Sequence, residues 1–223
     1  RAGHRYQRRH MLTHPRFNTI IFLCILAGVL LIFSRTSMAK GNDFESLRRE
    51  SVKIRTLQAD FSQKKIMKIL SKPLVSEGRF YFATPDSFRW EYTKPLKSVV
   101  VSHGRNTKRY MYADGKWVED KTDGAQAMRI VLNEIAGWMK GRFDQNPSFK
   151  ATISRKENTR ILLTPVAENM KGMIKSIEIT LAPRSGVVTS VKIMEGSDSV
   201  TWINFNNVQM NHVIDPSVFQ DVR

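Results

Sequence analysis

The feature that most constrains the fold is a long series of short segments in which apolar and polar residues alternate. "TPDSFRWEY", residues 84–92, places Phe88, Trp90 and Tyr92 at every second position, with Arg89 and Glu91 between them. A strand with this spacing presents three aromatic side chains on one face and charges on the other. Ten or eleven segments of this kind follow one another along the chain. The sequence therefore predicts a fold dominated by β-strands.

The turns between these segments indicate how the strands pair. Pro85 sets a turn in "TPDS", His103 and Gly104 form another, and Asp114-Gly115 is a strong hairpin signal. Strands joined by hairpin-length turns form an antiparallel sheet. No linker or low-complexity segment interrupts the series, so residues 40–223 are predicted to form a single domain.

Two helices are predicted to cover this sheet. The first begins near Asn42, with Glu45 three residues on as a capping box, and ends near Thr56. The second spans residues 124–139, begins after the cap Asp123 and ends before Gly141. Apolar residues recur along it at helical spacing: Ala125, Met128, Leu132, Ile135 and Met139. The predicted fold class is therefore α+β, with a strongly curved or partly closed antiparallel barrel covered by helices.

The N-terminal residues read as a secretory signal. Residues 19–33 are almost wholly apolar and follow a basic stretch, and Ser37 and Ala39 have the small-residue spacing of a cleavage site. We expect cleavage after Ala39, with Met11 as a plausible start. The alternative is an uncleaved anchor, although this run is shorter than the roughly 20 residues that a spanning helix needs.

The positive net charge of the chain indicates which kinds of partner it can bind. The chain carries a net charge of +16, and loss of residues 1–39 leaves 30 basic against 20 acidic residues, or +10. Basic proteins favour nucleic acid, anionic membranes or acidic proteins, and export argues against nucleic acid. Lys64, Lys65, Arg155 and Lys156 are candidates for a basic docking patch. The single cysteine, Cys24, lies in the signal, so no disulfide is expected.

Catalytic and metal-binding patterns are missing from the sequence. His103 and His212 are the two histidines beyond the signal, and neither has a second His or a Cys at metal-ligand spacing. Nothing selects a pair of carboxylates for glycoside hydrolysis among the 20 acids. We therefore expect a protein that is not an enzyme and needs no cofactor or metal.

Aromatic residues are concentrated in the first half of the predicted sheet. The positions are Phe61, Phe80, Phe82, Phe88, Trp90, Tyr92, Tyr110 and Tyr112. Eight methionines also lie beyond the signal, and Met suits surfaces that adapt to variable apolar shapes. A packed core and a ligand cavity share this composition, so pattern alone leaves both readings open.

Four motifs in order resemble the LolA family, periplasmic carriers that move lipoproteins to the outer membrane. "LQADFSQKK" is similar to the family's F-x-A-x-F-x-Q strand, and "SEGRFYFATPDSFRWEYTKP" resembles its G-x-h-x-h, Pro, F-x-W and Pro pattern. "VVSHGRNTKRYMYAD" and "FNNVQMNHVIDPSVFQ" resemble two further family segments. The resemblance covers nearly the whole chain beyond the signal. It implies an incomplete barrel with an apolar cavity for acyl chains.

The resemblance also implies roles for particular residues. Thr84, Pro85 and Phe88 would belong to a lid loop, and helix 124–139 would form part of the lid. At Thr84 the family's best-known members carry an Arg that helps to lock the lid, and His103 replaces a family Asp. The implied cavity lining comprises Phe61, Phe80, Phe82, Phe88, Trp90, Tyr92, Tyr110, Tyr112, Met128, Leu132 and Ile135.

The resemblance implies partners as well. The cargo would be an acylated lipoprotein or a related lipid, loaded by an inner-membrane ABC transporter and passed by a monomeric carrier to an outer-membrane acceptor. An alternative remains open: an exported interaction or regulatory module on the same fold, which senses lipid or docks on a membrane, with the aromatics as ordinary core.

Overall fold

The computed structural model describes residues 39–104, 106–121, 134–183, 186–196 and 198–222. The chain divides into two compact units, residues 1–40 and residues 41–223, and the second is described below. The predicted signal lies outside the described residues except for Ala39, so cleavage there stays a prediction.

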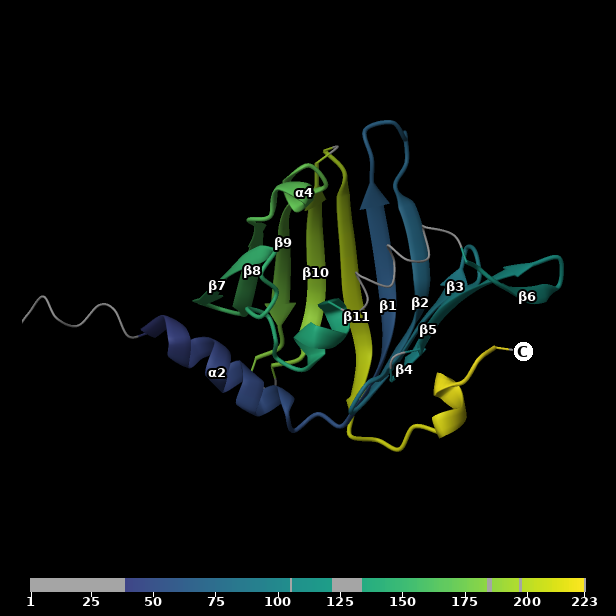
Figure 1. Ribbon diagram of the computed structural model, residues 1–223. Helices are drawn as coiled ribbons and strands as arrows, with labels where there is room; N and C mark the ends of the chain where they lie inside the picture. The colour runs from purple at the N-terminus through teal and green to yellow at the C-terminus, as the bar shows by residue number, and fades with distance from the viewer. Residues whose placement is uncertain (1–38, 105, 122–133, 184–185, 197, 223) are drawn as a thin grey trace, which may run out of the picture. The chain divides into compact units, whose positions relative to one another are not determined.

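Unit 41–223 is built on one open, curved sheet of eleven antiparallel strands (Figure 1). The strand order is β6-β5-β4-β3-β2-β1-β11-β10-β9-β8-β7, so sequential hairpins form two halves that join where β1 pairs with β11. This confirms the predicted fold class. The strands are β1 (Thr56–Ile66), β2 (Leu74–Ala83), β3 (Ser87–Lys94), β4 (Ser98–His103), β5 (Asn106–Ala113), β6 (Lys116–Glu119), β7 (Phe149–Arg155), β8 (Thr159–Pro165), β9 (Ile174–Leu181), β10 (Val188–Glu195) and β11 (Val200–Met210).

The first helix differs from its prediction at both ends. Helix α2 (Ala39–Ser51) begins before Asn42, which is therefore inside the helix and not its cap. It ends before Thr56, because that residue already pairs with Ala83 as the first residue of β1. Two short helices were not predicted, α4 (Glu168–Lys171) and the 3-10 helix η1 (Pro216–Phe219).

The second predicted helix is described in its last part. Residues 134–139 are helical, and Gly141 follows with a φ of +71°, a conformation that favours glycine at a helix end. Its predicted start at residue 124 lies outside the described residues. Within the described ranges, each helix is too short or too polar to span a bilayer.

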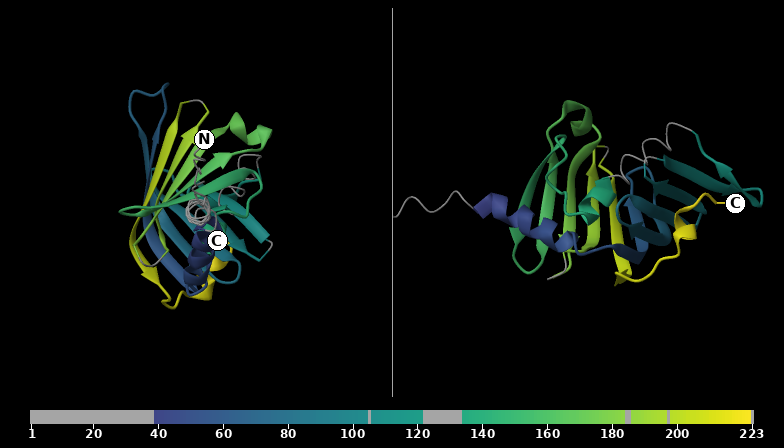
Figure 2. Two further views of the ribbon diagram at one scale, coloured as in Figure 1. Left: turned by 90° about the vertical axis from the view of Figure 1, so that its left-hand side faces the viewer. Right: turned by 60° about the horizontal axis from the view of Figure 1, so that its bottom comes forward.

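The two faces of the sheet bury different groups. We call inner face the one that carries the main apolar cluster, to which α2 contributes Phe44 and Leu47 and the helical residues contribute Trp138. The curvature of the sheet around this face is visible in Figure 2. The opposite, outer face carries a small cluster of Val99, Val101 and Tyr110.

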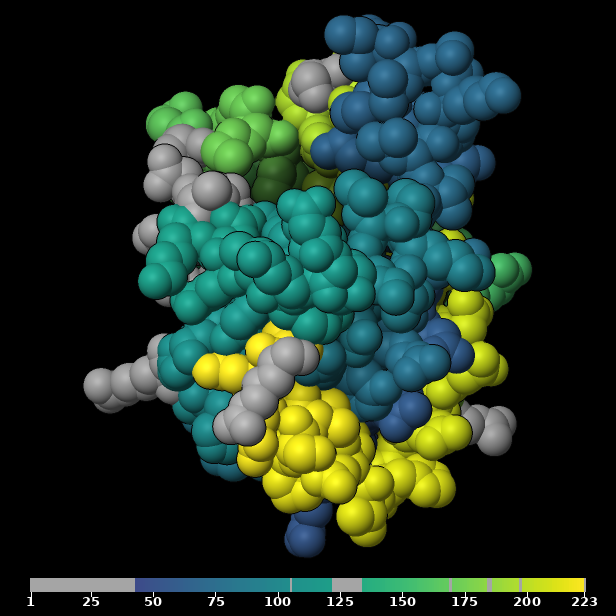
Figure 3. Space-filling model, turned by 90° about the vertical axis from the view of Figure 1, so that its right-hand side faces the viewer, coloured from purple at the N-terminus to yellow at the C-terminus, as the bar shows by residue number. Residues whose placement is uncertain are grey.

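The outer face is partly covered by the C-terminal segment. The Arg89 guanidinium donates to the Val218 carbonyl at 3.4 Å, and Lys108 pairs with Asp221. Figure 3 shows this segment in yellow against the blue and teal strands. β4 is therefore buried on both faces, as its run of valines requires.

Candidate functional site

Four aromatic rings from four strands meet on the inner face. Phe80 of β2 pairs with Trp90 of β3, and Phe61 of β1 pairs with Phe205 of β11. The ring centroids of Phe61 and Trp90 lie 4.3 Å apart, and those of Trp90 and Phe205 lie 6.0 Å apart, with the latter pair edge to face. Offset and edge-to-face contacts at these separations are favourable. The sheet register thus assembles one continuous aromatic surface.

Gly78 allows the Phe61 ring to lie flat across β2. A Cβ placed on Gly78 would come within 2.5 Å of the Phe61 ring and 2.0 Å of the Glu91 carbonyl oxygen. Both contacts are closer than any real Cβ tolerates. Gly78, the glycine of the G-x-h-x-h motif, is therefore needed for the Phe61 ring to pack on β2. Phe80 and Phe82 are the apolar positions of the same motif.

The aromatic surface ends at a polar pair. Tyr92 packs edge to face on Phe61 at 5.2 Å and donates its hydroxyl proton to Gln63 Oε1 at 2.9 Å. Burial raises the pKa of the Tyr92 hydroxyl, while the nearby Trp90 N–H acts in the opposite direction. A buried phenol needs such a partner. Nearby, Arg109 pairs with Asp120 at 2.9 Å.

At the other end of the aromatic surface, the β2–β3 loop is joined to the helical residues. The Lys140 ammonium donates to the Pro85 carbonyl and, at 2.7 Å, to Asp86 Oδ1. It also lies 6.0 Å from the centroid of the Phe82 ring. The hydrogen bond from Lys140 lowers the pKa of the Asp86 carboxyl. We call this set of contacts the Lys140 latch.

The segment that carries Lys140 covers the inner face. Ile135, Trp138, Met139 and Phe143 are all buried in the main cluster. We call residues 134–143 the cover. Gly141 passes so close to α2 that a Cβ there would lie 2.8 Å from the Cα of Arg48.

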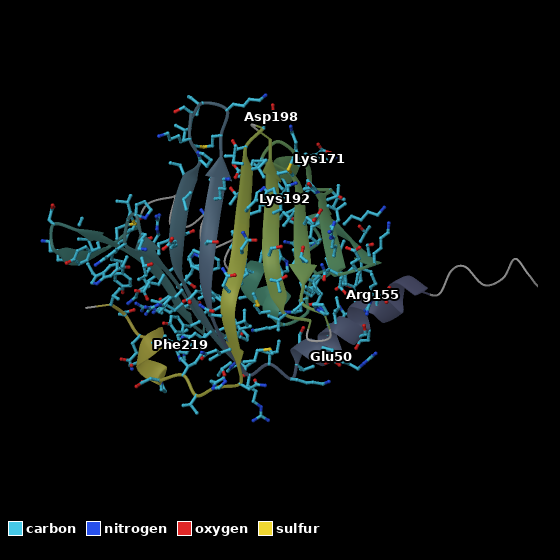
Figure 4. All side chains as sticks on the ribbon, turned by 180° about the vertical axis from the view of Figure 1, so that it is seen from behind. Glu50, Arg155, Lys171, Lys192, Asp198 and Phe219 are labelled. Carbon is cyan, nitrogen blue, oxygen red and sulfur yellow. The ribbon has the colours of Figure 1, made fainter. Side chains whose placement is uncertain are left out.

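The aliphatic part of the inner face is bordered by α2. The guanidinium of Arg48 pairs with Asp144 at 2.7 Å, just beyond the cover. Arg155, at the end of β7, donates to Ser46 Oγ at 2.6 Å and pairs with Asp43. Figure 4 shows Arg155 beside α2, which also carries Glu50. Arg155 and Lys156 thus lie at the opposite end of the sheet from Lys64 and Lys65, so the four predicted basic residues do not form one patch.

The structure brings most of the predicted lining residues together. Seven of them belong to the main cluster or pack against it: Phe61, Phe80, Phe82, Phe88, Trp90, Tyr92 and Ile135. Met128 and Leu132 lie outside the described residues. Whether the seven contact an acyl chain stays a prediction.

Two predicted lining residues lie on the other side of the sheet. Tyr110 pairs with Val99 and joins the outer-face cluster, and Tyr112 packs on Trp117 at 5.2 Å with 43% of its surface exposed. Their inclusion in the lining was wrong. The register of β4 and β5 turns these positions outward, while Val100 faces the inner cluster.

Several residues of the site were missed by sequence reasoning. Phe205 alternates with Ile203 in β11 and could have been found from that pattern. Gln63 shares a face with Phe61 two residues away, but nothing in the sequence pairs it with Tyr92. Lys140 and Asp86 are 54 residues apart, and no local signal connects them.

The two histidines of the described residues, His103 and His212, take part in ordinary hydrogen bonds. Among the described residues no group of three His, Cys, Asp or Glu side chains could hold a metal ion. His103 Nδ1 shares a hydrogen bond of 2.7 Å with Ser87 Oγ, and the His212 carbonyl accepts from Thr56 Oγ1.

Comparison with known proteins identifies the family. A family model described as outer membrane lipoprotein carrier protein LolA matches residues 52–221. The chain belongs to the LolA family. Its relatives include an outer-membrane lipoprotein carrier protein of Nitrosomonas europaea, 23% identical over 209 residues, which are 90% of this chain and 93% of the relative. The carrier protein of Salmonella paratyphi A is 25% identical over 198 residues, covering 87% of this chain and 90% of the relative.

Two solved structures resemble this chain at low sequence identity. An uncharacterised conserved protein of Thermus thermophilus superposes on 82% of this chain and 94% of its own with a TM-score of 0.51 and 8% identity. A LolA superfamily protein of Nitrosomonas europaea covers 82% of this chain and 99% of its own, with a TM-score of 0.40 and 7% identity.

Proposed function

We propose that this LolA family member is a periplasmic carrier that shields the acyl chains of lipoproteins, or of a related lipid, and moves them from the inner to the outer membrane. The relatives named as lipoprotein carriers support this role. The observation that carries the proposal is the single apolar surface along the inner face, which lies beneath a cover attached at its edge by the Lys140 latch.

The energetics of acyl transfer set what a carrier must provide. A buried methylene contributes about 0.8 kcal/mol, so a chain of about 14 methylenes is held in a bilayer by roughly 11 kcal/mol. Water cannot accept such a group. A carrier must offer comparable apolar surface, so that exchange with the membrane is nearly balanced and the cargo can be released.

The cargo would replace the cover. Ile135, Trp138 and Met139 fill the inner face in this structure. If the cover swings away, an acyl chain can contact the rings that these side chains now bury. The inner-face rings stay out of water in both states, because the acyl chain takes over the contacts that the cover side chains give up.

The latch would set how easily the cover moves. Thr84 provides no cation where the resemblance leads one to expect Arg. Lys140 supplies a cation from the cover. Its ammonium binds the Pro85 carbonyl and Asp86, in the loop that contains Thr84. We infer that the lock between loop and cover is kept, but that its positive charge lies on Lys140 of the cover and not on residue 84 of the loop.

Loading and release follow from the same proposal. An inner-membrane ABC transporter would insert the cargo and an outer-membrane acceptor would remove it, with the carrier acting as a monomer and without catalysis. The exported form would begin at Lys40.

The first experiment is native mass spectrometry of the protein taken gently from the periplasm, which would show a bound lipoprotein or lipid and identify it. The second is labelling with a photoreactive acyl chain. We expect label at inner-face residues such as Phe61 and Trp90, with Tyr112 of the outer face as the internal control. A protein that stays empty after incubation with lipids, or label on the outer face alone, would contradict the proposal.

A further inference from the structure

The tip of the β1–β2 hairpin exposes an unusual density of large apolar side chains. Ile69 is 87% exposed, Val75 55% and Leu74 52%, and Ile66 and Leu70 are also exposed. In Figure 1 the hairpin extends beyond the neighbouring strands, and it forms the top of the molecule in Figure 3. Such a patch on a soluble domain marks an interaction site.

The same segment is rich in lysine. "KKIMKILSKPLV", residues 64–75, contains four lysines and no acidic residue. Lys64, Lys68 and Lys72 are exposed. No ion pair of Lys72 is found within the described ranges, so its charge is available to a partner.

Ion pairs fix the position of the tip. Asp198, in the β10–β11 turn, accepts from both Lys68 of the hairpin and Lys175 of β9. These two lysines lower the pKa of Asp198 to about 2, so the bridge persists at neutral pH. Lys65 pairs with Glu195 at 2.9 Å. Figure 4 shows Asp198 beside the end of the hairpin.

We propose that this tip, residues 64–75, docks on an anionic lipid bilayer. The side chains of Ile69 and Leu70 would enter the headgroup region, and Lys64 and Lys72 would contact the lipid phosphates, while Lys68 stays paired with Asp198.

The chemistry of the tip favours a bilayer over a protein. A protruding, convex apolar tip fits a soft, unspecific apolar medium, whereas a protein partner needs a matching pocket. Stable binding to a bilayer surface takes two contributions, burial of apolar side chains and attraction of basic residues to anionic lipids, and the tip offers both. The proposal goes beyond the carrier function and needs no ligand on the inner face.

A site-specific fluorophore tests insertion. In a Cys24→Ser background the chain has no other thiol, so Ile69→Cys can carry an environment-sensitive dye. With vesicles containing about a third phosphatidylglycerol we expect a blue shift and a rise in intensity, which purely zwitterionic vesicles do not give. Lys156→Cys, an exposed site in the β7–β8 turn at the opposite end of the sheet, is the matched control and should not respond.

Vesicle sedimentation tests the contributions of the two signals. Ile69→Asp and Lys72→Glu should each weaken binding about tenfold, and Lys156→Glu should leave it unchanged. Because Ile69 and Lys72 are exposed, circular dichroism should show unaltered folding. Equal binding by all variants, or no response of the dye at position 69, would overturn the proposal. So would a concentration-dependent dimer that Ile69→Asp abolishes, which would assign the tip to a second copy of the chain.

The two proposals fail separately. If the tip does not bind vesicles but photoreactive acyl chains still label the inner face, the docking surface is refuted and the carrier function stands. If the inner face stays unlabelled while the tip binds vesicles, the carrier function is refuted and the docking surface stands.

Discussion

The two halves of the inner face bury different kinds of side chain. β1, β2 and β3, with Phe205 of β11, contribute rings that contact one another. We call this the aromatic half. β8, β9 and β10 contribute branched aliphatic side chains, among them Ile161, Ile179 and Val191, and we call this the aliphatic half.

The difference extends to what borders each half. The aliphatic half is bordered by α2, whose Leu47 approaches the turn before β10. The aromatic half is bordered by the cover, which reaches the Pro85 loop through Lys140. Rings present flat faces that a flexible chain can slide along, whereas interlocked aliphatic side chains pack like a solid core. We therefore propose that the aromatic half, which the cover borders, meets the cargo and that the aliphatic half holds the fold.

The largest expected effect comes from truncating the centre of each half. Trp90→Ala should destabilise the fold by about 3–5 kcal/mol and Ile179→Ala by about 2–5 kcal/mol, because both side chains are fully buried. Urea unfolding followed by circular dichroism measures this. Under conditions in which both variants are folded, only Trp90→Ala should lose affinity for a fluorescent fatty acid. Equal losses of affinity would mean that the halves do not differ in function.

The next effect concerns the glycine beneath the rings. Gly78→Ala should cost about 1–3 kcal/mol or more, since the new methyl group collides with Phe61 and with the Glu91 carbonyl. Gly172→Ala is the matched control, because a Cβ there meets nothing within 4 Å and its φ of −74° is ordinary. Thermal unfolding of the two variants should differ clearly. Similar melting temperatures would show that the ring does not depend on the glycine.

At the Lys140 latch we expect a smaller effect on stability but a measurable effect on the rate of acyl-probe uptake. Lys140→Met keeps the aliphatic stem and removes the charge, so it should lower stability by less than about 1 kcal/mol, as expected for a partly exposed ion pair. Uptake of an uncharged fluorescent acyl probe should become several-fold faster, while Lys140→Arg should stay close to the native rate. Stopped-flow fluorescence measures both. An unchanged rate in Lys140→Met would remove the latch from the mechanism.

The smallest effect is a dependence on pH. The pKa of Asp86 is lowered in the fold, so its contribution is complete above the ordinary value of 3.8 and is lost as the pH falls through the folded value. Acidification from about pH 5 to below the ordinary value of 3.8 should therefore begin to speed uptake of the uncharged probe. Asp86→Asn should show no such acceleration. If it accelerates equally, another group is responsible.

The sequence was sufficient for the fold class and for most of the aromatic half. Alternation along β1, β2 and β3 identified which residues share a face, since a period of two is set by strand geometry. It could not say which face of β5 turns inward, because the neighbouring β4 buries Val99, Val100 and Val101 alike and carries no period. The partners of the latch also escaped notice, since contacts across 54 residues depend on tertiary packing.

The open edges of the sheet have a mechanical consequence. β6 and β7 are the outermost strands of its order and do not pair with each other, so no ring of hydrogen bonds fixes the circumference. The sheet is held at its centre by β1, which pairs along most of its length with both β2 and β11. Under the proposed carrier function, a bulky guest would enter through a slight flattening of the sheet together with displacement of the cover. We expect this movement to keep the interstrand hydrogen bonds and to change only side-chain contacts.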